Sequence, residues 1–347
     1  MELTFRWYGE SDPIPLKYIK QIPRVSGIVS ALSDIPIGEI WSLEKISLLQ
    51  KRIESAGLNF SVIESIPVHE DIKLGLPNRD NLIENYCQSI RNMGSLGINI
   101  LCYNFMPVFD WTRSELALEL PDGSTCLSYD HNKINDTDIE TLSLGLPGWA
   151  TSYTQKQLQQ LLEAYEEVDE EGLWSNLKYF LERVVPVAEE SNVRMGIHPD
   201  DPPWSIFSLP RIITNEDSLD RLVKITNSKS NGITLCSGSF GPNSEMDIVK
   251  CIRKFGKMER IHFAHCRNIK RIGDHSFCEV QHPTEFGDVN MYEVIKAYVE
   301  VDFAGALRPD HGRMIWDENG RPGYGLYDRA LGIMYLSGLW EGIEKTI

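Results

Sequence analysis

Residues 232 to 265 decide the fold, and they read GITLCSGSFGPNSEMDIVKCIRKFGKMERIHFAH. Both ends of this stretch, Gly232–Ser237 and Arg260–His265, are short apolar runs of the kind that forms buried parallel strands. Between them, Ser244–Phe255 repeats apolar residues at the spacing of a helix. A strand, a helix and a second strand in this order predict a βαβ unit with two parallel strands.

The same alternation runs through the whole chain. Short apolar runs predict eight strands: Leu3–Tyr8, Val25–Leu32, Asn59–Glu64, Ile98–Asn104, Arg194–His198, Gly232–Ser237, Arg260–His265 and Phe303–Asp310. Helical patterns lie between and after them: Pro15–Gln21, Leu43–Ala56, Asn81–Leu96, Gln155–Glu190 (two or more helices), Glu216–Thr226, Ser244–Phe255, Met291–Val299 and Tyr327–Trp340.

Eight such units without a break favour an α/β fold with a closed parallel sheet. We therefore predict one (β/α)8 TIM-barrel domain over residues 1–347. An open doubly wound sheet is the alternative, but no glycine-rich dinucleotide or phosphate motif follows the first predicted strand.

One segment is too long for a simple loop. Residues 105–154 follow the fourth predicted strand and contain ELALELPDGSTCLSYD, two alternating runs around Pro121-Asp122-Gly123 that predict a hairpin. In a TIM barrel, the loops that follow the strands form the catalytic face. We therefore expect 105–154 to be an insertion on that face, where it either covers the active site or forms a subunit contact.

Composition and charge narrow the class of protein. Of the 347 residues, 42% are hydrophobic and 24% charged, which is typical of a globular chain with a large core. The formal net charge of −16 repels phosphate backbones, so we expect no nucleic-acid partner. We expect no membrane partner either, because no run approaches the ~20 apolar residues of a membrane span. The start, MELTFRWYGE, shows no signal peptide, and the seven cysteines have no paired spacing, so we expect a cytoplasmic protein with reduced thiols.

The last four predicted strands all end in side chains that can bind a metal. His198 ends the fifth strand, Cys236 the sixth, His265 the seventh and Asp310 the eighth. Any one of them alone would more often be a core or hydrogen-bonded residue. In a barrel, however, these strand ends are neighbours on one rim and point to a common centre. Because imidazole, thiolate and carboxylate groups suit a divalent transition metal, we predict one metal site from the four.

Other histidines and cysteines are weaker candidates. His262 and Cys266 flank His265, but strand alternation turns them to the opposite side of the sheet, and we interpret them as structural. His282 stays a further candidate, because the run EVQHPTEFGDVNM leads into the eighth unit on the catalytic side.

Seven motifs stand out along the chain: FRWYG (Phe5–Gly9), GIHPDDPPW (Gly196–Trp204), LCSGSFG (Leu235–Gly241), IHFAHCRN (Ile261–Asn268), FCEVQHPTEFGDVNM (Phe277–Met291), RPDHGR (Arg308–Arg313) and GYGLYDRALGIMYLSGLWEG (Gly323–Gly342). Together they resemble the mannonate dehydratases of hexuronate (glucuronate) breakdown, over essentially the whole chain. RPDHGR and LCSGSFG are the most specific of them. The four strand-end residues show no departure from the family.

The resemblance implies a xylose-isomerase-like TIM barrel, a Mn²⁺ or Fe²⁺ cofactor, and conversion of D-mannonate to 2-dehydro-3-deoxy-D-gluconate with loss of water. It also implies that the same four strand-end residues are the metal ligands. The family's acid/base pair resembles His311 and a tyrosine in the glycine-flanked run, and we choose Tyr324 over Tyr327, which begins a helix. We expect Tyr324 to be the base and His311 the acid. The opposite assignment stays open, as does a role for His311 in orienting a ligand.

Arginines and polar groups on the same rim should hold the sugar acid. Our candidates for substrate binding are Arg308, Arg313, Arg6 and Tyr8. The two arginines of RPDHGR bracket the proposed ligand, although either could instead pair with an acid such as Asp200 or Asp201. The pair at the end of the first strand could instead be barrel packing.

Three other functions fit parts of this pattern. A metal-dependent sugar isomerase or epimerase of the same barrel type is the main alternative, although such enzymes more often use carboxylate-rich ligand sets. A metal-dependent abasic-site nuclease is disfavoured by the net charge. An inactive sugar-acid-binding barrel would not need an acid/base pair beside the metal. As its assembly, we expect a homo-oligomer, in the simplest case a dimer.

Overall fold

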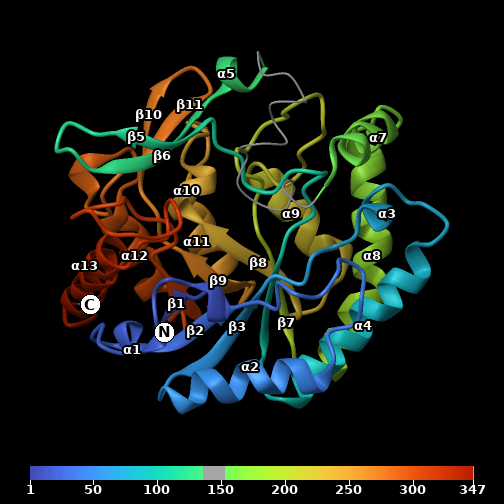
Figure 1. Cartoon of the computed structure of the whole chain (residues 1–347), viewed down its shortest axis with the longest axis horizontal. Helices are drawn as coiled ribbons and strands as arrows, with labels where there is room; N and C mark the ends of the chain where they lie inside the picture. Colours follow the sequence, from blue (N-terminus) through green and yellow to red (C-terminus); the bar gives the residue numbers. More distant parts are fainter. Residues whose placement is uncertain (136–152, 347) are drawn as a thin grey trace.

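The computed structural model describes residues 1–135 and 153–346. Eight parallel strands close into a barrel in the order β1-β12-β9-β8-β7-β4-β3-β2, and helices surround it (Figure 1). These strands are β1 (Glu2–Arg6), β2 (Val25–Ser30), β3 (Asn59–Glu64), β4 (Ile100–Tyr103), β7 (Arg194–Ile197), β8 (Asn231–Cys236), β9 (Ile261–His265) and β12 (Ala306–Arg308). The predicted TIM barrel is confirmed, and each of the eight predicted strands contributes one of its strands.

The helices follow the predicted order. They are α1 (Leu16–Ile19), α2 (Leu43–Ser55), α3 (Glu70–Lys73), α4 (Arg79–Ser95), α5 (His131–Asn135), α7 (Gln155–Tyr165), α8 (Glu170–Glu190), α9 (Glu216–Ile225), α10 (Ser237–Phe240), α11 (Ile248–Lys257), α12 (Met291–Glu300) and α13 (Tyr327–Glu344). Of these, α3, α5 and α10 are short turns that the sequence pattern did not predict, because so few residues give no measurable periodicity.

Helix α11 shows how the sequence positions an element. Its buried stripe is Ile248, Cys251, Ile252 and Phe255, which has the spacing of one helix face. The predicted start at Ser244 was wrong, because the side chain of Asp247 accepts a hydrogen bond from the backbone N–H of Lys250 and caps the helix there.

Strand β12 is shorter than the predicted Phe303–Asp310. It ends at Arg308, since Pro309 has no backbone N–H to donate to a sheet. Asp310 then adopts a left-handed backbone conformation with φ of +63°, which costs free energy for a residue that is not glycine and is typical of functional sites. The chain therefore leaves the barrel at the point where the site residues begin.

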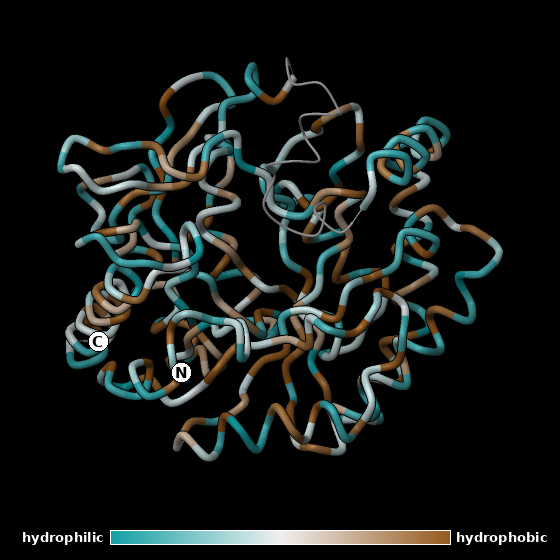
Figure 2. Tube along the Cα trace, in the orientation of Figure 1, coloured by the Kyte–Doolittle hydropathy of each residue, from teal (hydrophilic) through white to brown (hydrophobic). Residues whose placement is uncertain are grey.

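The barrel interior changes from apolar to polar along the strands. A buried apolar cluster fills it with Val29, Val62, Cys102, Phe263 and Ala306. Two residues further along three of these strands, and so on the same side, stand Glu64, His265 and Arg308. Figure 2 shows hydrophobic colour along the central strands and mixed colour on the surrounding helices. The polar end lies at the carboxyl ends of the strands, where TIM barrels hold their active sites.

A second sheet stands beside the barrel. Its order is β10-β11-β6-β5, formed by β5 (Glu115–Glu119), β6 (Thr125–Asp130), β10 (Ile269–Gly273) and β11 (Ser276–Glu279). The hairpin predicted within the insertion after the fourth barrel strand is present as β5 and β6. It pairs with β11, a strand that the sequence did not predict. Residues 136–152 of the predicted insertion lie outside the described residues.

Candidate active site

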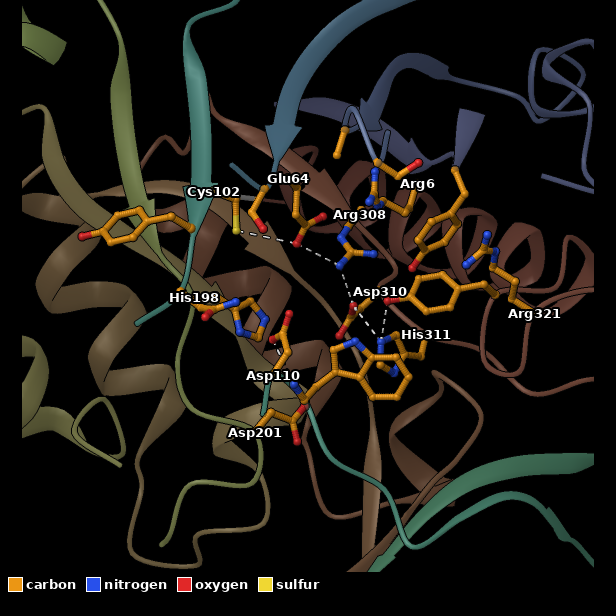
Figure 3. Close-up of a pocket in the computed structure, with 18 of the residues that line it drawn as sticks. Arg6, Glu64, Cys102, Asp110, His198, Asp201, Arg308, Asp310, His311 and Arg321 are labelled. Carbon is orange, nitrogen blue, oxygen red and sulfur yellow. Dashed lines mark hydrogen bonds and ion pairs between the residues drawn. The ribbon is translucent and has the colours of Figure 1, made fainter. Parts of the chain in front are cut away.

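One pocket of about 490 Å³ opens at the carboxyl ends of the barrel strands (Figure 3). Its wall comes from the ends of β1, β3, β4, β7 and β12 and from the chain that follows β12. The inserted segment contributes Asp110, Trp111 and Leu116 to the same wall. The insertion therefore covers part of this pocket.

The four predicted metal ligands meet beside the pocket. Donor atoms of His198, Cys236 and His265 lie within 4.8 Å of one another. Asp310 joins them, with Oδ2 3.4 Å from the Cys236 sulfur and Oδ1 3.7 Å from His265 Nδ1. In His198, Nδ1 contacts the Pro199 carbonyl at 2.8 Å, which leaves Nε2 for a ligand. Two imidazoles, a thiol and a carboxylate at this spacing fit one divalent transition metal.

Asp310 is ionised in its buried position. Burial disfavours its charge, but His311, Arg308 and Arg267 beside it outweigh that cost and hold the pKa of Asp310 well below its ordinary value. Its two oxygens lie 2.9 Å from Arg308 Nη2 and 2.9 Å from Arg267 Nε. The carboxylate is thus charged and fixed, as a metal ligand must be.

A second group of possible ligands fits a metal less well. Donor atoms of Glu64, Cys102 and His265 also lie within 4.8 Å of one another. However, Arg308 Nη2 stands 3.1 Å from Glu64 Oε1 and already supplies the positive charge there. Burial, and next Glu64, raise the pKa of the Cys102 thiol well above its ordinary value, and a protonated thiol is a poor ligand.

The two predicted catalytic residues are in direct contact. His311 Nε2 and the Tyr324 hydroxyl are 2.8 Å apart, and both side chains line the pocket. On its other side, His311 Nδ1 lies 2.9 and 3.0 Å from the two oxygens of Glu279. Burial, together with Tyr8, raises the pKa of Tyr324 well above its ordinary value, so its hydroxyl is protonated.

Glu279 belongs to a buried group of four charges. Arg113 lies 2.7 Å from Glu279 and 2.8 Å from Asp201, and Arg267 lies 2.6 Å from Asp201 and also pairs with Glu279. Burial disfavours the charge of Glu279, but Arg267, His311 and Arg113 outweigh it and lower its pKa to about 2. A permanently charged carboxylate therefore faces His311.

Three of the four predicted substrate residues line the pocket, namely Arg6, Tyr8 and Arg308. The structure places Arg313 elsewhere: its guanidinium pairs with Asp328 at 2.8 Å and with Asp122 at 2.6 Å. Arg313 is thus held in two ion pairs and does not line this pocket. Arg313 does not pair with Asp200 or Asp201, the acids suggested from the sequence. Asp201 pairs with Arg113 and Arg267 instead, and Asp200 pairs with Arg211.

The two residues that flank His265 lie away from the pocket, as expected for structural residues. His262 and Cys266 are buried and do not line the pocket. His262 approaches Gly232 so closely that a Cβ there would stand 2.2 Å from its Nε2. His282 does not reach the pocket either, because its Nε2 contacts the Pro309 carbonyl at 2.8 Å.

Residues of the site that sequence reasoning missed include Glu64, Asp110, Trp111, Glu279 and Arg321. Glu64 could have been predicted, since it is the last residue of a predicted strand and points to the same side of that strand as the buried Val62. Glu279 could not have been predicted, because its strand belongs to the second sheet, whose pairing with the insertion leaves no local pattern.

Comparisons with known proteins agree with this geometry. The sequence matches the family described as D-mannonate dehydratase (UxuA) over residues 1–347. The chain belongs to the mannonate dehydratase family. The mannonate dehydratase of Streptococcus agalactiae serotype Ia is 55% identical over 345 residues, which cover 99% of each chain. Mannonate dehydratase 2 of Halalkalibacterium halodurans is 56% identical over 345 residues, 99% of this chain and 100% of that one.

Solved structures agree on the fold. The crystal structure of the mannonate dehydratase from Streptococcus suis serotype 2 matches with a TM-score of 0.93 and 47% identity, over 100% of this chain and 95% of that one. D-psicose 3-epimerase of Clostridium cellulolyticum H10 matches with a TM-score of 0.56 and 13% identity, over 99% of both chains. That second likeness shows the xylose-isomerase-like barrel alone and does not favour an epimerase activity for this mannonate dehydratase family member.

Proposed function

We propose that the chain dehydrates D-mannonate to 2-dehydro-3-deoxy-D-gluconate in hexuronate (glucuronate) catabolism. One observation carries the proposal: His198, Cys236, His265 and Asp310 converge at the pocket that also contains His311 and Tyr324. The relatives of this chain at 55% identity are mannonate dehydratases over almost their whole length. Sugar isomerisation or epimerisation has no comparable support.

We propose Mn²⁺ or Fe²⁺ as the cofactor, held by those four ligands. A divalent ion bound there would supply Lewis-acid charge to the bound substrate. Two imidazoles and a carboxylate suit either ion, and the thiolate favours a transition metal over Mg²⁺. Arg267 Nη2 lies 3.8 Å from the Cys236 sulfur and so places a positive charge beside this proposed ligand.

The contact between His311 and Tyr324 supports a division of the proton transfers. Dehydration removes a proton from C2 and expels the C3 hydroxyl, which leaves as water once it is protonated. Glu279 accepts a hydrogen bond from Nδ1 of His311, which leaves Nε2 of the same ring to take the C2 proton. Glu279 then stabilises the imidazolium that forms.

Tyr324 is suited to the other transfer. Its raised pKa keeps the hydroxyl protonated in the resting enzyme, so it can give its proton to the leaving C3 hydroxyl. This reverses the assignment expected from the sequence and takes up the alternative left open there. The reason is tertiary: the contact with Glu279 suits His311 to accept a proton, and burial keeps the Tyr324 hydroxyl protonated, so that it has a proton to give.

The decisive experiment is a turnover assay. Purified protein with Mn²⁺ is incubated with a panel of hexonates, and the 2-keto-3-deoxy product is detected. We expect turnover of D-mannonate, its loss after treatment with a chelator, and its return with Mn²⁺ or Fe²⁺. Product from another hexonate and none from D-mannonate would contradict the proposed substrate. Chelator-insensitive turnover would contradict the metal.

We further propose a homodimer whose interface includes the outer face of α13. Tyr327, Leu331 and Met334 are exposed there at 42–48%, and Trp316 packs on Tyr327 with ring centroids 5.5 Å apart. No charged residue occurs in α13 between Arg329, which is buried, and Glu341. A chain with net charge −16 repels its own copy except over such an uncharged surface.

We also propose a cytoplasmic location. All seven cysteines are buried free thiols, as is usual in a reducing compartment. Separately, none of the helices in the described part of the chain is long and apolar enough to cross a membrane.

A further inference from the structure

Two charged side chains in the pocket, the buried Arg308 and Glu64, whose side chain is 14% exposed, each have one buried atom without a hydrogen-bond partner among the described residues. These atoms are Nη1 of Arg308 and Oε2 of Glu64. Both side chains line the pocket, and Arg308 is only 3% exposed. A buried charged atom without a partner costs considerable free energy. A partner from outside the chain would remove this cost.

The other atoms of the two groups are already engaged. Arg308 Nη2 lies 3.1 Å from Glu64 Oε1 and 2.9 Å from Asp310, and Nε lies 2.9 Å from His265 Nε2. Glu64 Oε1 also lies 3.3 Å from His265 Nε2 and 3.6 Å from the Cys102 sulfur. Figure 3 shows Glu64 and Arg308 pointing toward each other above Asp310. Each group thus keeps one polar atom for a ligand.

The chemistry of these two atoms selects the ligand. A guanidinium N–H only donates hydrogen bonds, and an ionised carboxylate only accepts them. A single partner for both atoms would therefore accept from Arg308 and donate to Glu64. A hydroxyl does both, and two adjacent hydroxyls can share the task. A substrate carboxylate cannot occupy this position, because it would face Glu64 with like charge and has no proton to donate.

We propose that Glu64 and Arg308 form a hydroxyl-binding subsite that reads one sugar hydroxyl, or two adjacent ones, and so determines which hexonates the pocket accepts. This inference rests on the proposed function, since it takes the ligand to be a sugar acid. The subsite would also orient the substrate, with the hydroxyl-bearing part of the sugar acid toward Glu64 and its carboxylate directed elsewhere. A site built to pair with a hydroxyl discriminates strongly against an analogue that lacks it, because its buried polar atoms are then left unpaired.

The test compares Glu64→Gln with the parent protein. Gln keeps the shape of the side chain but loses the charge that accepts the hydroxyl proton. Both proteins carry His311→Asn, so that D-mannonate binds without being consumed, and both are loaded with Mn²⁺. Calorimetry then measures the Kd of D-mannonate and of analogues that each lack one hydroxyl from C2 to C6. Glu54→Gln, an exposed carboxylate on α2, is the control for the change in net charge.

We expect Glu64→Gln to weaken D-mannonate binding by about 10- to 100-fold. For the analogue that lacks the hydroxyl in contact with Glu64, the same substitution should cost less than about twofold, since the interaction is already absent. The other analogues should lose as much affinity as D-mannonate. Glu54→Gln should change none of these values, and the Mn²⁺ affinity of Glu64→Gln should stay within about twofold of the parent.

Two results would overturn the inference. One is an equal cost for D-mannonate and every analogue, above all with weakened Mn²⁺ binding, because Glu64 would then act only by positioning His265. The other is no cost at all. Turnover of D-mannonate by the wild-type enzyme is measured in parallel. If turnover is normal and either result appears, only this inference fails. If no hexonate binds or turns over, the proposed function fails with it.

Discussion

At the scale of the residue, each site side chain depends on a neighbour that the sequence does not place beside it. His311 is oriented by Glu279 at 2.9 Å, although the two are separated by 32 positions. Asp310 is held between Arg308 and Arg267, and its left-handed backbone turns the chain out of the barrel. These contacts hold the side chains in position and place charges beside them, which affects how a residue can bind a metal or move a proton.

Replacing Cys236 with serine should weaken metal binding. A hydroxyl is a harder and poorer ligand than a thiolate, so we expect the Kd for Mn²⁺ or Fe²⁺ to rise by about tenfold or more. Metal titration of the purified apoprotein measures this. Cys251→Ser, at a buried cysteine on α11, is the matched control and should keep its metal affinity. An unchanged affinity in Cys236→Ser would remove the thiol from the ligand set.

Replacing His311 with asparagine should separate proton transfer from metal binding. We expect kcat to fall by about 10²-fold or more while the bound metal is retained. Steady-state kinetics and metal analysis of the same preparation test both statements. His275→Asn, at an exposed histidine, should leave kcat unchanged. Near-normal turnover of His311→Asn would assign the proton transfer to another residue.

At the scale of the element, the second sheet completes the active site. Strand β11 carries Glu279 to His311, and β11 itself pairs with β6 of the insertion. The insertion also supplies Arg113, which is wholly buried between Glu279 and Asp201. The insertion therefore holds a charge that fixes Glu279 beside His311, the histidine proposed to be catalytic.

Arg113→Met should destabilise the protein strongly. Removing one cation leaves Glu279 and Asp201 with a single buried arginine, and breaking a buried ion pair in this way costs about 3–5 kcal/mol of unfolding free energy. Urea unfolding measures the loss, and kcat should fall with it, since Glu279 is held less firmly. Arg91→Met removes an exposed pair with Glu84 and should cost at most about 1 kcal/mol. Similar losses of unfolding free energy in the two variants would show that the buried ion pairs of Arg113 stabilise the protein no more than an exposed pair does.

At the scale of the whole molecule, the net negative charge and the uncharged face of α13 have opposite effects on the association of two copies. The net charge of −16 keeps copies apart in most orientations. The face formed by Tyr327, Leu331 and Met334 is the kind of surface on which two copies can meet without burying unpaired charge.

Leu331→Arg should therefore convert the proposed dimer to a monomer. In a symmetric interface the new charge is buried twice, next to its own copy. Sedimentation velocity at several concentrations measures the assembly. Leu48→Arg, at an exposed leucine on α2, should leave it dimeric. A wild-type protein that is monomeric throughout, or a Leu331→Arg variant that stays dimeric, would contradict the proposed interface.

Much of this molecule could be predicted from local patterns. Alternation of short apolar runs with helical stripes gave the eight strands, because buried strands and amphipathic helices each leave a period in the sequence. The position of His198, Cys236, His265 and Asp310 at successive strand ends was visible for the same reason. The ends of elements were less accurate, as at Ser244 and Phe303, since caps and backbone turns act over single residues.

The sequence by itself determined the barrel, the family and the set of residues able to bind a metal, because these depend on periodicity and on motifs that are local in the chain. Only the tertiary structure decided the pairing of Glu279 with His311, the diversion of Arg313 to Asp328, and the unpaired atoms of Glu64 and Arg308. The physical reason is that electrostatic interactions depend on distance in space and on burial. Neither quantity is set by separation along the chain.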